Sequence, residues 1–265
     1  RVELPAMTFE ELRQALPWEA RRHIAGLPED AIVDAQVLSH GSQTSPMEIL
    51  LVAFPRPQYE RVESLCARAG IAAEFVDLGQ LSTMNALSGA RPSSEVVGLL
   101  DLGADDAFFA AFSSSNLVLF RDLSVRAARL DALLAERFGL GPADVETLKT
   151  SGKLPGGGAP SPAKLEEALG EVIGELAEDL RSGLVYLENR TGTTLERVHL
   201  TGGSAAFVER QGIADAIAAQ SGVTLERFDP FHGFRFGLID EAGLRVAVSE
   251  LCAAAGVAIR FFGAA

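Results

Sequence analysis

The feature that most constrains the fold of this chain is the stretch of residues 198–206, where an apolar run passes directly into a Gly-Gly pair. Its first four residues can lie in a buried strand, and a helix is expected to begin near Ser204. Because Gly202 and Gly203 lack a Cβ atom, the main chain can bend sharply and a ligand can approach it closely. A helix N-terminus attracts anions, so a nucleotide fits this turn. The alternative is a turn without a ligand, since strand-to-helix turns are common in α/β proteins.

A second candidate site follows an expected strand at residues 96–102. Asp101 stands at the end of this strand, and Gly103 begins the turn that leads to Asp105 and Asp106. A carboxylate beside a glycine turn is a suitable partner for a hydrated metal ion on a phosphate group. A plain hairpin, in which Asp and Gly serve only the turn, explains the same residues equally well.

Composition excludes several classes of function. The chain has 265 residues, 48% of them hydrophobic and 22% charged, which is typical of a globular protein. Its formal net charge of -13 opposes binding to nucleic acid, so a nucleotide would depend on local backbone amides and a cation. No apolar run approaches the roughly 20 residues that a membrane-spanning helix needs.

The first part of the chain, residues 1–78, is expected to form a small α-β-β-α-β unit. A capping box between Thr8 and Glu11 predicts the start of its first helix. The other expected elements are strands at 31–38 and 48–54, a helix at 59–69 and a strand at 71–76. A connecting helix and loop are then expected at residues 79–94.

The remainder, residues 95–265, is expected to form a larger α/β unit. Three strands come in quick succession and are followed by helices, then by a β-α-β-α order that includes residues 198–206. The expected strands are 96–102, 107–112, 117–123, 198–201 and 223–225, and the expected helices are 123–138, 142–150, a long one from Pro162 capped by Ser161, 205–220 and 244–262. This order predicts the α/β class with mixed sheets.

The pairing of Asp101-Leu102-Gly103 with residues 200–205 resembles the second phosphate motif and the adenosine motif of the actin-like ATPase superfamily. Within that superfamily, the chain most resembles the PilM-type proteins of type IV pilus assembly, which are relatives of the cell-division protein FtsA. Further stretches carry the resemblance across nearly the whole chain: 15–20, 139–142, 145–149, 229–231 and 254–258.

This resemblance implies an actin-like (ribonuclease H-like) fold of two lobes, with a first lobe that is incomplete here because the chain begins after the family's first phosphate motif. It also implies ATP and Mg²⁺ as cofactors. Asp101 and Gly103 would face the phosphates, with Asp101 holding the metal through water. The implied adenosine contacts are Gly202, Gly203 and Ser204, with Glu146 and Lys149 near the ribose and base.

Two departures from the family pattern weaken the expected phosphate chemistry. Asp105 and Asp106 stand where the family usually has a hydroxyl residue, and these carboxylates repel a phosphate unless a cation lies between them. Arg126 and Ala127 replace a Gly-Gly pair before the next helix. The sequence therefore predicts that nucleotide binding is degenerate and hydrolysis more so.

The expected function is that of a cytoplasmic scaffold, peripheral at the inner membrane, which docks the N-terminal tail of a PilN-type membrane protein in a groove beside the small subdomain. Pilus assembly motor ATPases would be reached indirectly, and the membrane only through partners. One alternative is a working ATPase whose nucleotide state controls lobe closure. Another is the actin-like domain of a type II secretion platform.

Overall fold

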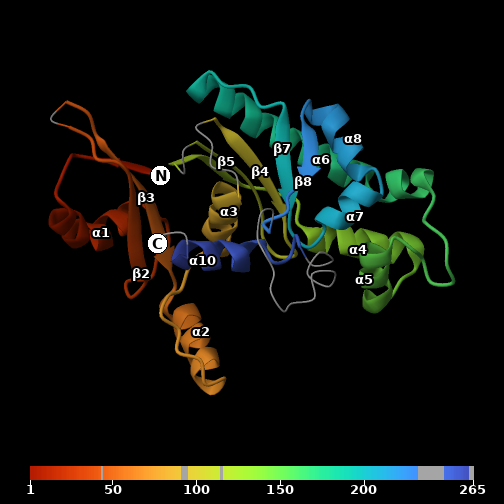
Figure 1. Cartoon of the computed structure of the whole chain (residues 1–265), viewed down its shortest axis with the longest axis horizontal. Coiled ribbons are helices and arrows are strands. Elements are labelled where there is room, and N and C mark those ends of the chain that lie inside the picture. The colour runs from red at the N-terminus through yellow and green to blue at the C-terminus, as the bar shows by residue number, and fades with distance from the viewer. Residues whose placement is uncertain (43, 91–94, 114–115, 232–247, 263–265) are drawn as a thin grey trace. The chain divides into compact units, whose positions relative to one another are not determined.

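The computed structural model describes residues 1–42, 44–90, 95–113, 116–231 and 248–262 (Figure 1). The chain divides into two compact units, Arg1–Val76 and Asp77–Ala265. Each unit has its own sheet, and the two are described in turn. Among the helices that the structure describes, none combines the length and the apolar character that crossing a bilayer requires.

The first unit is a three-stranded antiparallel sheet covered by one helix. Its elements are β1 (Val2–Leu4), α1 (Phe9–His23), β2 (Ile32–Ser39), β3 (Met47–Phe54) and α2 (Arg56–Arg68), and the strand order is β1-β3-β2. The expected capping box begins α1, since the Thr8 side chain accepts from the Glu11 amide and the Glu11 carboxylate accepts from the Thr8 amide. The core of this unit consists of Val2, Leu4, Leu12, Leu16, Met47 and Ile49.

The expected strand at 71–76 is wrong, because these residues form no strand and Ile71 and Phe75 are about three-fifths exposed. The place beside β3 is taken instead by β1, whose Val2 pairs with Ile49. Residues 2–4 alternate between buried and exposed side chains, which is the pattern of a strand with one face on a core. The sequence order of this unit is therefore β-α-β-β-α.

The second unit is built on a five-stranded mixed sheet with the order β6-β5-β4-β7-β8. Its strands are β4 (Val97–Leu102), β5 (Ala107–Ser113), β6 (Asn116–Asp122), β7 (Arg197–Thr201) and β8 (Thr224–Arg227). The first three form an antiparallel meander, whereas β7 runs parallel to both β4 and β8. Because β4 and β7 are parallel neighbours, their carboxyl ends meet at one edge of the sheet, where Asp101 pairs with Thr201.

The helices of the second unit pack on this sheet and on one another. They are α3 (Gly79–Ala90), α4 (Ala127–Phe138), α5 (Pro142–Ser151), α6 (Pro162–Thr191), α7 (Ala205–Arg210), α8 (Ile213–Ser221) and α10 (Cys252–Phe262). Ser161 caps α6 by accepting from the Lys164 amide, as its position before Pro162 predicts. The buried stripe of α6 keeps helical spacing from Leu165 to Leu187, and its Gly183 lies directly against the Phe109 ring.

Two helix boundaries differ from the expected ones. The helix expected at 205–220 is two helices, because Gly212 adopts a φ of 71° and interrupts the hydrogen-bond ladder between α7 and α8. The helix expected from residue 123 begins at Ala127, since β6 continues to Asp122. Residues 232–247 lie outside the described residues, and with them most of the Phe-rich loop and the expected start of the last helix; the described part of that helix begins at Cys252.

The helices α3 and α10 cross at very short range. A Cβ atom on Gly256 would lie 1.6 Å from the carbonyl oxygen of Ser82, so no other residue fits there without moving a helix. This contact places α3 within the second unit, which begins at Asp77, two residues before the expected boundary after residue 78. Of the expected connector at 79–94, residues 79–90 form α3 and 91–94 lie outside the described residues.

Candidate nucleotide site

Asp101 and Gly202 lie in contact at the carboxyl ends of β4 and β7. Gly202 has a φ of 93°, and a Cβ atom on it would lie 2.5 Å from the Leu102 carbonyl carbon and 2.7 Å from Asp101 Oδ1. Only glycine tolerates both this backbone conformation and this approach. Gly203 differs, because a Cβ atom there would meet no described atom within 4 Å. Atoms of Asp101 and Leu102 thus fill the space beside Gly202, whereas no described atom fills the corresponding space at Gly203.

The turn that follows Asp101 is equally tight. A Cβ atom on Gly103 would lie 2.5 Å from the Asp106 carbonyl oxygen and 3.6 Å from Asp101 Oδ1. The carbonyl oxygens of Gly103 and Ala104 accept from the amides of Ala127 and Ala128 at the start of α4. These two amides are therefore already hydrogen-bonded and are not available to bind an anion.

Asp101 lies in surroundings that disfavour its charge. Burial and, secondly, the neighbouring Asp106 carboxylate raise the pKa of Asp101 from 3.8 to about 7. A carboxyl group with this pKa is half protonated near neutral pH. A divalent cation next to it would reverse the effect by favouring the ionised form.

The residues on either side of the Gly-Gly pair are anchored in the interior. The Thr201 hydroxyl donates to the Ser249 carbonyl oxygen at 3.1 Å and lies 2.8 Å from the Sγ atom of Cys252. The Ser204 amide is 3.4 Å from the Leu102 carbonyl oxygen, and the Ser204 hydroxyl is buried with no hydrogen-bond partner among the described residues. Ser204 therefore retains an unused polar group at the base of the turn.

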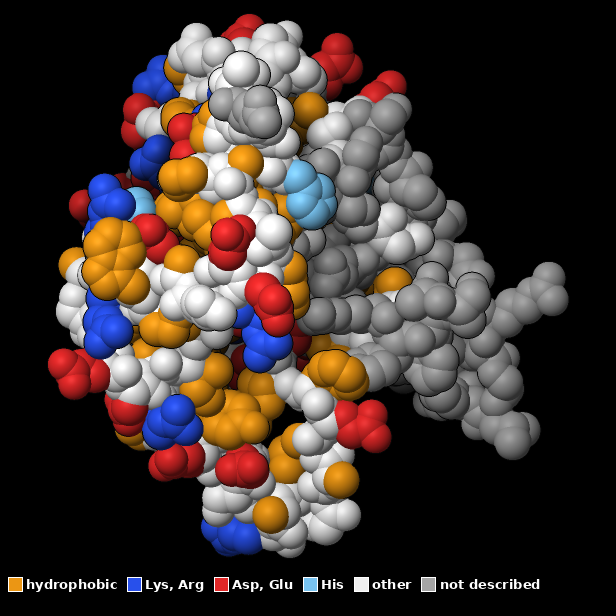
Figure 2. All heavy atoms as spheres, turned by 90° about the vertical axis from the view of Figure 1, so that its left-hand side faces the viewer, with side chains coloured by type: hydrophobic (Ala, Val, Ile, Leu, Met, Phe, Trp, Pro, Cys, Tyr) orange, Lys and Arg blue, Asp and Glu red, His pale blue; other side chains and the backbone are white. Residues whose placement is uncertain are grey.

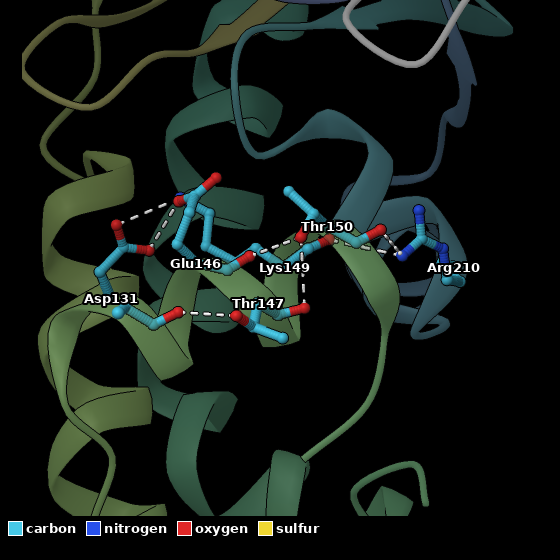
Figure 3. A network of polar contacts seen from close by, with 7 residues as sticks. Asp131, Glu146, Thr147, Lys149, Thr150 and Arg210 are labelled. Carbon is cyan, nitrogen blue, oxygen red and sulfur yellow. Dashed lines mark hydrogen bonds and ion pairs between the residues drawn. The ribbon is translucent and has the colours of Figure 1, made fainter. Parts of the chain in front are cut away.

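Glu146 and Lys149 form a second group on α5 (Figure 3). The Lys149 ammonium group is about one-tenth exposed and lies 3.1 Å from the carboxylate of Asp131 on α4, and 3.8 Å from Glu146. The carboxylate of Glu146 is largely exposed. The charge of Lys149 is thus engaged within this group, which the sequence had not indicated because Asp131 lies 18 residues away.

Arg210 connects this second group to the Gly-Gly turn. It ends α7, the helix that starts just after Ser204, and donates to the carbonyl oxygen of Thr150 at 2.7 Å (Figure 3). This bond satisfies an otherwise unpaired carbonyl at the C-terminal end of α5. No sequence signal marks Arg210, because the contact joins residues 60 positions apart.

The residues that are present partly fit a hydrated magnesium ion. Asp101 supplies the hard oxygen ligand that Mg²⁺ prefers, and the neighbouring Gly203 has no described atom within 4 Å of its Cβ position. Within the described ranges, however, no group of three or more His, Cys, Asp or Glu side chains could hold a metal ion. A bound ion would depend on water and phosphate oxygens for its remaining ligands.

Comparison with known proteins identifies the family. Residues 3–262 match the profile of the family "Type IV pilus assembly protein PilM". The chain belongs to the PilM family. The predicted resemblance is thereby confirmed over nearly the whole sequence. A comparison with curated protein sequences gives no match.

One solved structure confirms the predicted α/β, actin-like fold class for this PilM-family chain, and two others are less similar. A chain of the "PilM-PilN type IV pilus biogenesis complex" is similar with a TM-score of 0.81 at 21% sequence identity, over 98% of this chain and 74% of that chain. EutJ, an ethanolamine utilization protein from Carboxydothermus hydrogenoformans, gives 0.49 at 14% identity, over 94% and 98%. MreB5 of Spiroplasma citri bound to ADP gives 0.49 at 13% identity, over 77% and 65%.

The fold brings together most of the predicted site residues of this PilM-family protein. Asp101, Gly103, Gly202 and Ser204 share one sheet edge, and Gly203 presents the open side of the turn. Glu146 and Lys149 lie together on α5 but are occupied with each other and with Asp131. The missed residues are Thr201, which directly precedes the glycines, and the distant Asp131 and Arg210.

Proposed function

We propose that this chain acts as a scaffold in the type IV pilus assembly platform by docking the N-terminal tail of a PilN-type membrane protein. The observation that carries the proposal is the match to the PilM family over residues 3–262. The protein would work on the cytoplasmic side, peripheral at the inner membrane, and reach the motor ATPases indirectly. The fold likeness to a structure titled as a PilM–PilN complex supports the choice of partner.

The local chemistry at Asp101 supports a scaffold more than an ATPase. Without a cation, burial and Asp106 raise the pKa of Asp101 to about 7, so near neutral pH Mg²⁺ would have to displace a proton in order to bind there. The α4 amides that would otherwise face an anion are bonded to the carbonyl oxygens of Gly103 and Ala104. Nucleotide binding would therefore be weak, and hydrolysis absent.

Binding of the partner tail tests this function directly. A fluorescent peptide with the N-terminal sequence of a PilN-type protein from the same organism is titrated with the full-length protein, and anisotropy is measured. We expect saturable binding that a scrambled peptide does not reproduce. Equal anisotropy for the two peptides would sink the scaffold proposal.

A nucleotide-controlled switch is the second candidate, favoured by the two glycine turns that meet at Asp101. Here ATP and Mg²⁺ would bind at Asp101, Gly103, Gly202, Gly203 and Ser204, and the nucleotide state would control lobe closure. Calorimetry with Mg-ATP on the full-length protein and its Asp101→Ala variant decides between the candidates. If the unaltered protein binds Mg-ATP and the Asp101→Ala variant does not, the result supports the switch. If neither protein gives a heat of binding, the scaffold proposal is favoured.

A further inference from the structure

The outward face of α1 combines a tryptophan with three arginines. Six exposed positions of the helix form two parallel rows with a spacing of four residues, so they share one continuous surface. We call this surface the α1 face; it consists of Arg13, Gln14, Pro17, Trp18, Arg21 and Arg22. The opposite side of the helix supplies Leu12 and Leu16 to the core, so the α1 face points away from that core.

Trp18 is exposed to an extent that packing of the first unit does not explain. Its side chain is 59% exposed, although it is a large apolar group in the middle of the helix. The guanidinium group of Arg22 lies 5.4 Å from the centre of the Trp18 ring, which is a cation–π contact. Arg21 is tied back by a bond from Nε to the Pro17 carbonyl oxygen at 3.1 Å. The tryptophan is thus held outward between positive charges.

The α1 face carries no acidic side chain, in a chain with 36 acidic and 23 basic residues. Three carboxylates border it. Glu11 serves the helix cap, and Glu10 lies one turn before Gln14. The buried Glu19 lies 3.3 Å from His23 and 3.9 Å from Arg22, so it offsets part of the charge of Arg22. The positive charge of this face is therefore local and acts over a distance of about one Debye length, roughly 8 Å.

We infer that the α1 face of Arg13, Trp18, Arg21 and Arg22 binds an anionic phospholipid surface. A tryptophan ring is suited to the boundary between headgroups and acyl chains, and arginines beside it can pair with lipid phosphates. A convex helix face matches a flat membrane, and its arginines attract anionic lipids locally although the chain as a whole has a net charge of -13. The inference goes beyond the proposed function, in which the membrane is reached only through a partner.

On the face that Figure 2 draws, orange hydrophobic side chains are interspersed with blue Lys and Arg and with red Asp and Glu. An interfacial surface needs apolar groups that enter the headgroup region and cations at its polar boundary, as Trp18 and the arginines of the α1 face supply. Binding would be weak and would orient a protein that is already held nearby.

Intrinsic fluorescence tests the inference, because Trp18 is the only tryptophan in the chain. The full-length protein is mixed with vesicles of phosphatidylglycerol and phosphatidylcholine in equal parts, and separately with vesicles of phosphatidylcholine alone. If the full-length protein contains further tryptophans, they are first replaced by phenylalanine. We expect a blue shift of the emission with the anionic vesicles only, which raised salt abolishes.

Two triple variants separate local charge from net charge. Arg13→Gln, Arg21→Gln and Arg22→Gln together should weaken vesicle binding by about a hundredfold. Arg137→Gln, Arg181→Gln and Arg197→Gln remove the same charge from exposed positions of the second unit and should leave binding unchanged.

Three results would overturn the inference: no shift with either vesicle, an equal shift with both, or equal losses in the two triple variants. A blue shift with soluble polyglutamate but none with anionic vesicles would instead assign the α1 face to an acidic protein segment. Because no partner peptide is present, failure here leaves the test of tail docking unaffected.

Discussion

The Oδ1 atom of Asp101 lies 2.7 Å from the position that a Cβ atom would occupy on Gly202. This approach joins the ends of two parallel strands that are about a hundred residues apart in sequence, and it decides which residues can line the candidate site. Residue 202 must be a glycine because Asp101 lies against it, and Asp101 can keep its position only while residue 202 has no side chain. The two motifs are therefore one structural unit, whether or not a nucleotide binds.

Replacement of Gly202 by alanine should destabilise the second unit by roughly 2–4 kcal/mol. The added methyl group meets the Leu102 carbonyl group and Asp101, and alanine is strained at a φ of 93°. Gly203→Ala is the matched control, because its Cβ enters open space, and it should change stability by less than about 0.5 kcal/mol. Urea unfolding of both variants measures the difference, and equal midpoints would contradict the described contact.

Asp101→Asn should stabilise the protein above neutral pH. Since the pKa of Asp101 is about 7 in the folded protein against 3.8 for the free group, the folded state holds the proton more tightly. Unfolding then releases a proton between pH 4 and 7, so the contribution of Asp101 to stability falls as pH rises through this window and is lost above it. The Asp101→Asn substitution removes this pH-dependent loss of stability, which is at most about 4 kcal/mol above pH 7.

The measurement is the difference in unfolding free energy between Asp101→Asn and the unaltered protein at pH 4 and pH 8. We expect the difference to grow with pH. A flat profile for Asp101→Asn would mean that the carboxyl group is ionised at little cost.

Gly256→Ala should disrupt the packing of α10 on α3 and cost about 3 kcal/mol, because the methyl group would overlap the Ser82 carbonyl oxygen. Gly170→Ala, within α6, is the contrasting variant. Its Cβ meets no described atom within 4 Å, and alanine favours a helix over glycine, so we expect a gain of roughly 0.5–1 kcal/mol. Thermal unfolding should give shifts of opposite sign.

The two cysteines should differ sharply in thiol reactivity. Burial raises the pKa of Cys252 to about 12, with a smaller opposing effect from its contact with Thr201, so almost no thiolate forms at pH 8. Cys66 is half-buried on α2, a helix without a fully buried residue. A maleimide at pH 8 should therefore modify Cys66 alone in the folded protein and both cysteines in urea. Peptide mass mapping identifies the labelled cysteine, and labelling of Cys252 in the folded protein would contradict the prediction.

Local signals in the sequence determined much of the second unit. The strand run before Gly202, the Ser161-Pro162 start of α6 and the regular spacing of its leucines depend on residues within a few turns of one another. Such short-range signals act through backbone conformation and the side-chain period, and both can be read along the chain. The order of the motifs was also enough to identify the PilM family and its actin-like fold.

Tertiary structure decided what depends on distant partners. Residues 71–76 have the apolar character of a strand but form none, whereas β1, a strand that was not predicted, pairs with β3 across more than 40 residues of sequence. The charge of Lys149 is committed to Asp131, and Arg210 joins α5 to α7, through contacts that no local pattern encodes. The raised pKa of Asp101 likewise arises mainly from burial, which is a property of the packed sheet edge and not of the turn that carries the residue.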